Sequence, residues 1–248
     1  MYVELFGLPG SGKTTIAKRL CSKYLEDSYT LRSGYKKGIC QEIPILKKGP
    51  LCSLIPLELL EFLGTATKQI SIQKILEENY NFIHYSSNLV EYYTNDVGRH
   101  KTVKRWIRDL VTRYSLSMQT LGSNKSIIGD EGFLQRANAI FCPRNPLSEL
   151  DREDVQTYVS MMPTPDYVIL LEVSKEIAER RMRQRNTGPP KSFSKHGERE
   201  FTRRIERMDT FVEYASAALD DLGIPCIHIR NEGSPDEACD QITNKIDF

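Results

Sequence analysis

The sequence predicts an α/β fold built around a parallel β-sheet, because short β-rich runs alternate with long segments of helical periodicity. Four apolar runs with strand character occur at Tyr2–Phe6, Ser126–Gly129, Tyr167–Leu171 and Pro225–Ile229. A glycine-rich stretch follows the first run directly and leads into apolar residues at helical spacing, which predicts strand, loop and helix in succession. A weaker strand candidate, Tyr29–Arg32, raises the expected sheet to about five strands.

The chain is expected to form a single domain over residues 1–248. Its 248 residues, 40% of them hydrophobic and 27% charged, are enough to bury a sizeable core. Between about residues 50 and 123 no strand candidate competes with helical periodicity, which is carried by Leu57, Leu60 and Leu63 and again by Trp106 and Leu110. This segment is therefore expected to be a helical insert within the domain.

Charge and hydropathy exclude several classes of protein. Lys and Arg number 34 against 33 Asp and Glu, so the chain lacks the global field that would hold it on nucleic acid or an anionic membrane. The longest run without a charged residue, Asn79–Val90, is shorter than the about 18 apolar residues that a membrane span needs. No signal peptide is evident, and six cysteines without metal-binding spacing are typical of free thiols. A cytoplasmic protein without a membrane partner, for which nucleic acid is a disfavoured partner, is expected.

The most specific motif is Gly7–Thr14, whose sequence GLPGSGKT fits G-x-x-x-x-G-K-[ST] and lies between a strand and a helix. Such a loop wraps its backbone NH groups around phosphate oxygens, and the following helix adds the positive end of its dipole. Lys13 is expected to reach the β and γ phosphates, Thr14 to ligate Mg²⁺, and Thr15 to pack or cap. The predicted cofactors are ATP and Mg²⁺, bound by Gly7, Pro9, Gly10, Ser11, Gly12, Lys13, Thr14 and Thr15.

Two carboxylates, Asp130 and Glu131, follow the strand Ser126–Gly129. The carboxyl end of a parallel strand is where α/β proteins bind ligands, so both are expected to face the phosphates. Asp130 suits the Mg²⁺ shell, and either carboxylate could accept the proton of an attacking hydroxyl. The sequence does not decide which of the two is the base.

Positive charge is concentrated in two segments, with a net charge of +6 over residues 175–207 and +5 over residues 99–113. The first contains a helix-like arginine cluster followed by a Gly/Pro/Ser run, as a closing lid over about residues 180–200 would require. Arg181 and Arg185 are expected to neutralise charge on the transferring phosphoryl group.

With these motifs the chain resembles the P-loop kinases, and among them the thymidylate-kinase-like group of nucleoside and nucleotide kinases. The resemblance covers about residues 1–35 and 105–248, and the phosphate loop is its only highly specific part. It implies a P-loop NTPase three-layer sandwich, ATP with Mg²⁺, and an acceptor held by the helical region. Three arginines occupy the general places from which such kinases contact an acceptor: Arg32, Arg108 and Arg113.

One departure from that group bears on the chemistry. Thymidylate kinases carry an arginine after the strand-end aspartate to bind the acceptor phosphate, and Glu131 stands there in this chain. A second carboxylate repels phosphate, and a hydroxyl acceptor, unlike a phosphate, must lose a proton as it attacks. The prediction is an ATP-dependent phosphotransferase moving the γ-phosphate to a small-molecule acceptor, with a slight preference for a sugar or nucleoside hydroxyl. The alternative of a nucleoside monophosphate acceptor stays open, because Arg108, Arg113 or Arg136 could bind its phosphate.

Rival interpretations remain. An ATP-hydrolysing switch protein without an acceptor would also use Asp-Glu after a hydrophobic strand, to bind Mg²⁺ and activate water. A nucleic-acid end kinase would use the basic segment around Trp106. The sequence is compatible with a homodimer, and it identifies neither the acceptor, the preference for ATP over GTP nor the oligomeric state.

Overall fold

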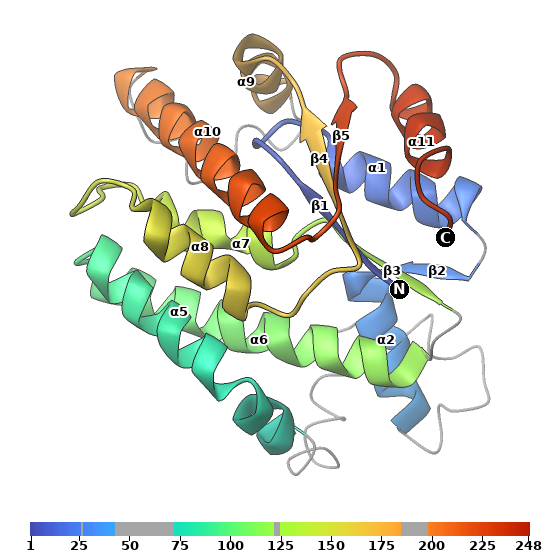
Figure 1. Ribbon diagram of the computed structural model, residues 1–248, viewed down its shortest axis with the longest axis horizontal. Coiled ribbons are helices and arrows are strands. Elements are labelled where there is room, and N and C mark those ends of the chain that lie inside the picture. The colour runs from blue at the N-terminus through green and yellow to red at the C-terminus, as the bar shows by residue number, and fades with distance from the viewer. Residues whose placement is uncertain (26, 43–71, 122–124, 185–197) are drawn as a thin grey trace.

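The computed structural model describes residues 1–25, 27–42, 72–121, 125–184 and 198–248 (Figure 1). Within these residues five strands form one sheet, in which every pairing is parallel and the order is β2-β3-β1-β4-β5. The strands are β1 (Tyr2–Phe6), β2 (Ser28–Thr30), β3 (Ser126–Gly129), β4 (Tyr167–Glu172) and β5 (Cys226–Arg230). The predicted α/β class with a parallel sheet of about five strands is therefore confirmed.

Helices connect the strands and cover the sheet. The described helices are α1 (Lys13–Arg19), the π-helix η1 (Leu20–Tyr24), α2 (Leu31–Glu42), residues 72–78, α5 (Tyr80–Tyr93), α6 (Val97–Leu121), α7 (Phe133–Phe141), α8 (Arg152–Met161), α9 (Lys175–Arg183), α10 (Glu198–Asp221) and α11 (Pro235–Thr243). Because all five strands run the same way, each connection crosses back over a face of the sheet.

The sheet is buried on both faces, which gives three layers. In β1, Tyr2 and Phe6 join a large hydrophobic cluster with the helices from α5 to α8 and α10, whereas Val3 and Leu5 join a second cluster with α1 and α11. Figure 1 shows α1 and α11 on one side of the sheet and α7, α8 and α10 on the other. This alternation follows from the period of two in a strand, so a five-residue apolar run supplies both cores.

The described part of the predicted insert is helical and shares the core of the sheet. Phe82 and Leu89 of α5 and Ile107 of α6 belong to the same hydrophobic cluster as Tyr2 of β1. Helix α6 packs on α2, α5 and α7, and α5 packs on α7 and α8. The helical periodicity at Leu57, Leu60 and Leu63 lies outside the described residues.

The predicted C-terminal boundary of the strand Tyr29–Arg32 is wrong by two residues, because β2 ends at Thr30 and α2 begins at Leu31. The Thr30 side chain explains the boundary. Its Oγ1 accepts a hydrogen bond from the backbone NH of Ser33 at 3.2 Å, as an N-cap residue does. The cap satisfies an amide of the first helical turn, so the chain turns from strand to helix without a loop.

Helix α11 begins within the stretch Gly233–Glu237. Ser234 caps it through a complete capping box: its hydroxyl accepts from the NH of Glu237 at 3.2 Å, and the Glu237 carboxylate accepts from the NH of Ser234 at 3.2 Å. Pro235 occupies the first helical turn, where its missing NH costs nothing. These local contacts fix where the helix starts.

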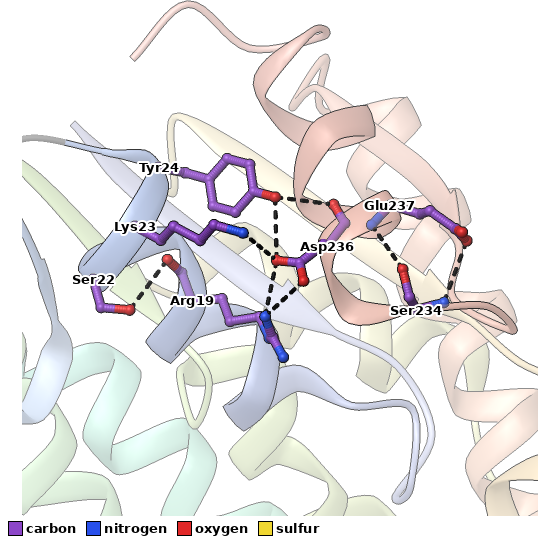
Figure 2. Close-up of polar contacts among 7 residues, drawn as sticks. All are labelled: Arg19, Ser22, Lys23, Tyr24, Ser234, Asp236 and Glu237. Atoms are coloured by element: carbon purple, nitrogen blue, oxygen red, sulfur yellow. Dashed lines mark hydrogen bonds and ion pairs between the residues drawn. The ribbon is translucent and has the colours of Figure 1, made fainter.

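A second set of contacts binds α11 to α1 and η1 (Figure 2). The Asp236 carboxylate accepts two hydrogen bonds from Arg19 at 2.8 Å each, one from Lys23 at 3.0 Å and one from Tyr24 at 3.2 Å. The hydrogen bond from Lys23 and the charges of Lys23 and Arg19 lower the pKa of Asp236. Helix α1, which carries the phosphate loop at its start, is thus held against α11 by its far end.

Within the described ranges, no helix is both long enough and apolar enough to span a membrane. Four of the six cysteines, namely Cys21, Cys142, Cys226 and Cys239, have described side chains, and all four are free thiols.

Candidate active site

The phosphate loop lies between β1 and α1, and its glycines adopt backbone conformations that other residues disfavour. Gly7, Gly10 and Gly12 have φ angles of 134°, 91° and 94°. A Cβ atom on Gly10 would lie 2.3 Å from the carbonyl oxygen of Ala178, and one on Gly12 would lie 2.6 Å from Nδ2 of Asn231. The loop is therefore enclosed by α9 on one side and by the residue after β5 on the other.

Lys13 lies inside this loop, with 8% of its surface exposed. Its ammonium group donates hydrogen bonds to the carbonyl oxygens of Gly7 and Leu8, at 2.8 Å each, and to Oγ of Ser11 at 3.2 Å. These oxygens hold the ammonium over the centre of the loop. A phosphate oxygen presented to the loop would meet both the inward NH groups and this charge.

Asn231, directly after β5, supports the loop and was not singled out from the sequence. It is 3% exposed, and its Nδ2 donates to the carbonyl oxygen of Ser11 at 2.6 Å. The Asn231 carbonyl oxygen in turn accepts a hydrogen bond from Arg181 at 2.7 Å. The available signal was its position at the carboxyl end of a strand, where α/β proteins place ligand-binding residues.

The loop adjoins a cleft of 750 Å³, and both Thr14 and Asp130 line it. We call it the acceptor-side cleft, after the role that the sequence predicts for its arginines. Its lining residues come from α1, the β2–α2 junction, α6 and the β3–α7 junction: Thr14, Lys18, Thr30, Leu31, Arg32, Arg105, Trp106, Asp109, Leu110, Arg113, Asp130, Glu131 and Arg136. The cleft thus brings together Arg32, Arg113 and Arg136 with both strand-end carboxylates.

One expectation, that Thr15 packs or caps, is wrong. Thr15 is exposed, so it neither packs nor caps; α1 has Gly12 at its N-cap and no side-chain cap. Arg108 is exposed and lies outside the residues that line the cleft. The residues of α6 that line the cleft, which include Arg105, Asp109 and Arg113, share one face of the helix, and Arg108 projects beyond the edge of that face.

Glu131 and Asp130 have different surroundings. Oε2 of Glu131 accepts a hydrogen bond from Arg136 at 2.5 Å, and the Arg136 guanidinium lies 5.3 Å from the ring centroid of Trp106. The Glu131 side chain is 64% exposed, and its charge is balanced by this pair. Among the described residues no ion pair involves Asp130, which leaves its carboxylate available to a metal ion or a proton.

Glu4, in the middle of β1, was also missed from the sequence. Its side chain is fully buried, and its carboxylate accepts hydrogen bonds from the backbone NH groups of Phe133, Leu134 and Gln135 at 3.0, 2.6 and 3.1 Å. Burial raises the pKa of Glu4 to about 7, against the effect of these hydrogen bonds. The signal was the lone charged residue inside an otherwise apolar strand, YVELF.

The contact from Glu4 positions α7, because the three NH groups belong to the first turn of that helix, where negative charge is favoured. Gly132, just before the helix, has no room for a side chain: a Cβ atom there would lie 2.4 Å from Cδ of Glu4. Helix α7 is thereby seated directly on β1. This contact also positions the residues around the start of α7 that line the cleft beside the phosphate loop, namely Asp130, Glu131 and Arg136.

The predicted lid is described only at its two ends. Arg181 lies on α9, and Arg185 lies outside the described residues together with 186–197. Arg181 donates to the backbone carbonyls of Asn231 and Glu232, at 2.7 and 3.5 Å. It therefore reaches the phosphate loop through Asn231, and the acceptor-side cleft is lined by other arginines.

These features define the fold: an α/β protein in which a glycine-rich loop with the P-loop sequence pattern follows the central strand of a parallel sheet, and a cleft adjoins that loop. No model of a known protein family matches the chain, and no curated protein matches its sequence. Three solved structures with a similar fold are of deoxyadenosine kinase from M. mycoides. With the products dCMP and a flexible dCDP bound, the TM-score is 0.45 and the identity 17%, over 99% of this chain and 97% of that one. With dCTP and with dATP bound, the TM-scores are both 0.46 and the identities both 19%, over 99% and 98% of the two chains. At this level of similarity the function has to be inferred from the site.

Proposed function

We propose that the protein is an ATP-dependent kinase that transfers the γ-phosphate of Mg·ATP to a small-molecule acceptor. The observation that carries the proposal is that Thr14 of the phosphate loop and Asp130 at the end of β3 line one cleft. A nucleotide held by the loop would present its terminal phosphate at this point, and an acceptor in the cleft would lie in line with it.

The residues present fit a magnesium ion. Mg²⁺ prefers oxygen ligands and usually takes only one or two from the protein, the rest coming from water and nucleotide phosphates. The Thr14 hydroxyl and the Asp130 carboxylate are such a pair in one cleft. When bound, the ion would neutralise charge on the phosphates.

The acceptor we favour is a hydroxyl group. The acceptor oxygen forms a bond to the γ-phosphorus as the bond to the bridging oxygen breaks, ADP leaves, and the hydroxyl proton passes to a base. Asp130 is better placed for this role than Glu131, because Arg136 already engages Glu131 at 2.5 Å.

The charge of the cleft supports a second candidate, a nucleoside monophosphate acceptor. Among the described residues that line the cleft, five are basic and three acidic. The Glu131–Arg136 pair also reduces the repulsion that Glu131 would exert on an acceptor phosphate. An acceptor that carries negative charge besides its attacking oxygen would match this excess of basic over acidic residues in the cleft.

Further features belong to this proposal as predictions from the sequence. Arg181 and Arg185 act from a lid over about residues 180–200, and the chain works as a single domain in the cytoplasm. A homodimer is compatible with them.

The test is a γ-phosphate transfer screen with Mg·ATP over nucleosides, nucleoside monophosphates, sugars and sugar nucleotides, with a control lacking acceptor. We expect phosphorylated product from one acceptor class and slow hydrolysis in the control. Hydrolysis that is equally fast with and without every acceptor would support the ATP-hydrolysing switch instead. Transfer to nucleoside monophosphates alone would select the second candidate.

A further inference from the structure

A second cleft, with a volume of 560 Å³, lies between the α7–α8 connection and helix α10. It shares no lining residue with the acceptor-side cleft. Figure 1 shows α7, α8 and α10 on one side of the sheet. The residues that line it are Pro143, Arg144, Asn145, Pro146, Glu149, Leu150, Glu200, Arg203, Arg204, Glu206, Arg207, Thr210 and Tyr214.

Arginines dominate this cleft. Among the described residues that line it, four are arginines and three are glutamates, and one glutamate, Glu200, pairs with Arg144 at 3.1 Å. Arg99 of α6 adds a further positive charge close to Arg204. The other two glutamates of the cleft, Glu149 and Glu206, are exposed to solvent. The lining therefore carries more arginines than glutamates, and only one of its glutamates is partly buried.

Backbone carbonyl groups, which carry no net charge, hold Arg99 and Arg207. Nη2 of Arg99 donates to the carbonyl oxygen of Ala139 at 2.9 Å, and Nε of Arg207 donates to that of Phe141 at 2.6 Å. Both carbonyls belong to the last turn of α7, where the helix dipole favours cations. Nε of Arg99 and Nη2 of Arg207 are buried without a hydrogen-bond partner among the described residues. Buried donors of this kind are costly unless something accepts their hydrogen bonds.

Burial and a neighbouring positive charge both disfavour the charged form of Arg204. Burial, and then the charge of Arg99, lower the pKa of Arg204 to about 10. Burial also lowers the pKa of Arg99. An anion between the guanidinium groups would relieve both the desolvation and the repulsion, whereas a neutral ligand would relieve neither.

We propose that this cleft binds the phosphate group of a phosphorylated small molecule, at a site separate from the phosphate loop and the acceptor-side cleft. Planar guanidinium groups match phosphate oxygens with paired hydrogen bonds, and Arg207, which lines the cleft, has a buried Nη2 without a hydrogen-bond partner among the described residues. Pro143, Leu150 and Tyr214 supply an apolar wall for the rest of the ligand. The volume falls within the about 300–1,000 Å³ typical of sites for such molecules.

The test is calorimetric titration of inorganic phosphate into the full-length Lys13→Ala protein, which lacks the lysine of the phosphate loop. We expect saturable binding to one site, and a loss of affinity of at least about tenfold in a Lys13→Ala/Arg204→Gln double variant, as for the removal of one charged hydrogen-bond partner. Lys13→Ala/Arg230→Gln is the matched control, because Arg230 is an exposed arginine of β5 with 79% of its side chain accessible. Its affinity should stay within about twofold.

The proposal is overturned if the Lys13→Ala protein shows no saturable phosphate binding, or if the Arg204 and Arg230 variants lose affinity equally. Thermal unfolding without phosphate shows whether the Arg204 variant still folds. If it does not, Lys13→Ala/Arg204→Lys, which keeps the charge and loses the planar fork, must bind phosphate more weakly than Lys13→Ala. Sulfate should compete with phosphate, and acetate at the same ionic strength should not; equal competition by both would mean general screening and would contradict a phosphate site.

Discussion

The phosphate loop and the acceptor-side cleft meet at Thr14, yet they are built in different ways. The loop consists of eight consecutive residues, and the groups that would face phosphate are mainly backbone amides and one lysine. The cleft is assembled from side chains of α1, the start of α2, α6 and the start of α7, which lie far apart in the sequence. A site made of backbone depends on local conformation, whereas a site made of side chains depends on how helices pack.

The two regions are also supported differently. Glycines at positive φ let the loop fit between Ala178 of α9 and Asn231 after β5. The cleft instead depends on α7, which Glu4 holds at its first turn and Arg99 and Arg207 hold at its last turn. Changes in the loop should therefore abolish the reaction, and changes in the cleft should alter acceptor use or pH dependence.

The largest effect is expected for Lys13→Ala. The variant should lose phosphoryl transfer by about 10³-fold or more, because the ammonium group is the loop's only side-chain cation and stabilises charge on the transferring group. Steady-state assays test this, with Lys101→Ala, an exposed lysine of α6, as control. Near-normal turnover in a folded Lys13→Ala protein would rule out the loop as the nucleotide site.

The next effect separates the two carboxylates of the cleft. Asp130→Asn should lower kcat by about 10²–10⁴, the usual contribution of a general base, and should raise the Mg²⁺ concentration that is needed. Glu131→Gln should lower kcat by less than about tenfold, because Glu131 is exposed and paired with Arg136. Measurement of kcat and acceptor KM for both variants checks this. If both amides are nearly silent, base-assisted transfer to a hydroxyl is wrong.

Glu4 links the two regions, since it lies in β1 directly before the loop but acts on α7. Its pKa of about 7 in the folded protein lies above the ordinary value of 4.5 for a glutamate, so folding favours the protonated form. The stability that Glu4 contributes should thus be complete below about pH 4.5 and should fall by about 3 kcal/mol as the pH rises through 7.

Urea unfolding of the wild-type and Glu4→Gln proteins between pH 4.5 and 8 measures this effect as the difference between two curves. Gln cannot titrate, so the wild type should lose its advantage as the pH rises. Parallel curves would show that the Glu4 pKa is not raised.

A smaller effect on the cleft is expected from Arg113→Gln. The variant should raise the acceptor KM by about tenfold and leave the ATP KM within about twofold, if the acceptor is anionic. Arg108→Gln, on the same helix but outside the cleft, should change neither constant. An equal effect of both substitutions would contradict the placement of Arg113 at the acceptor.

The smallest effect concerns the support of α1 by α11. Ser234→Ala removes one half of the capping box and should lower the free energy of unfolding by about 1 kcal/mol, with little change in kcat. Thermal unfolding and steady-state kinetics measure the two quantities. A large loss of kcat at unchanged stability would mean that α11 acts on the phosphate loop directly.

The sequence by itself determined the strands and the phosphate loop, because both depend on local chemistry. The boundaries of β1 and β3 agree with the apolar runs Tyr2–Phe6 and Ser126–Gly129. Short, largely apolar runs bounded by glycine are typical of strands buried on both faces, and the loop's motif needs no distant residue to be recognised.

Only the tertiary structure decided which side chains meet. Arg105, rather than Arg108, reaches the acceptor-side cleft because α6 presents one face to α1 and α7. Glu4, Asn231 and Arg204 act through residues more than 60 positions away or through a cleft between separate helices. Such contacts follow from helix packing and burial, which no local pattern encodes, so a charged residue in a strand or on a helix reveals its partner only in the folded chain.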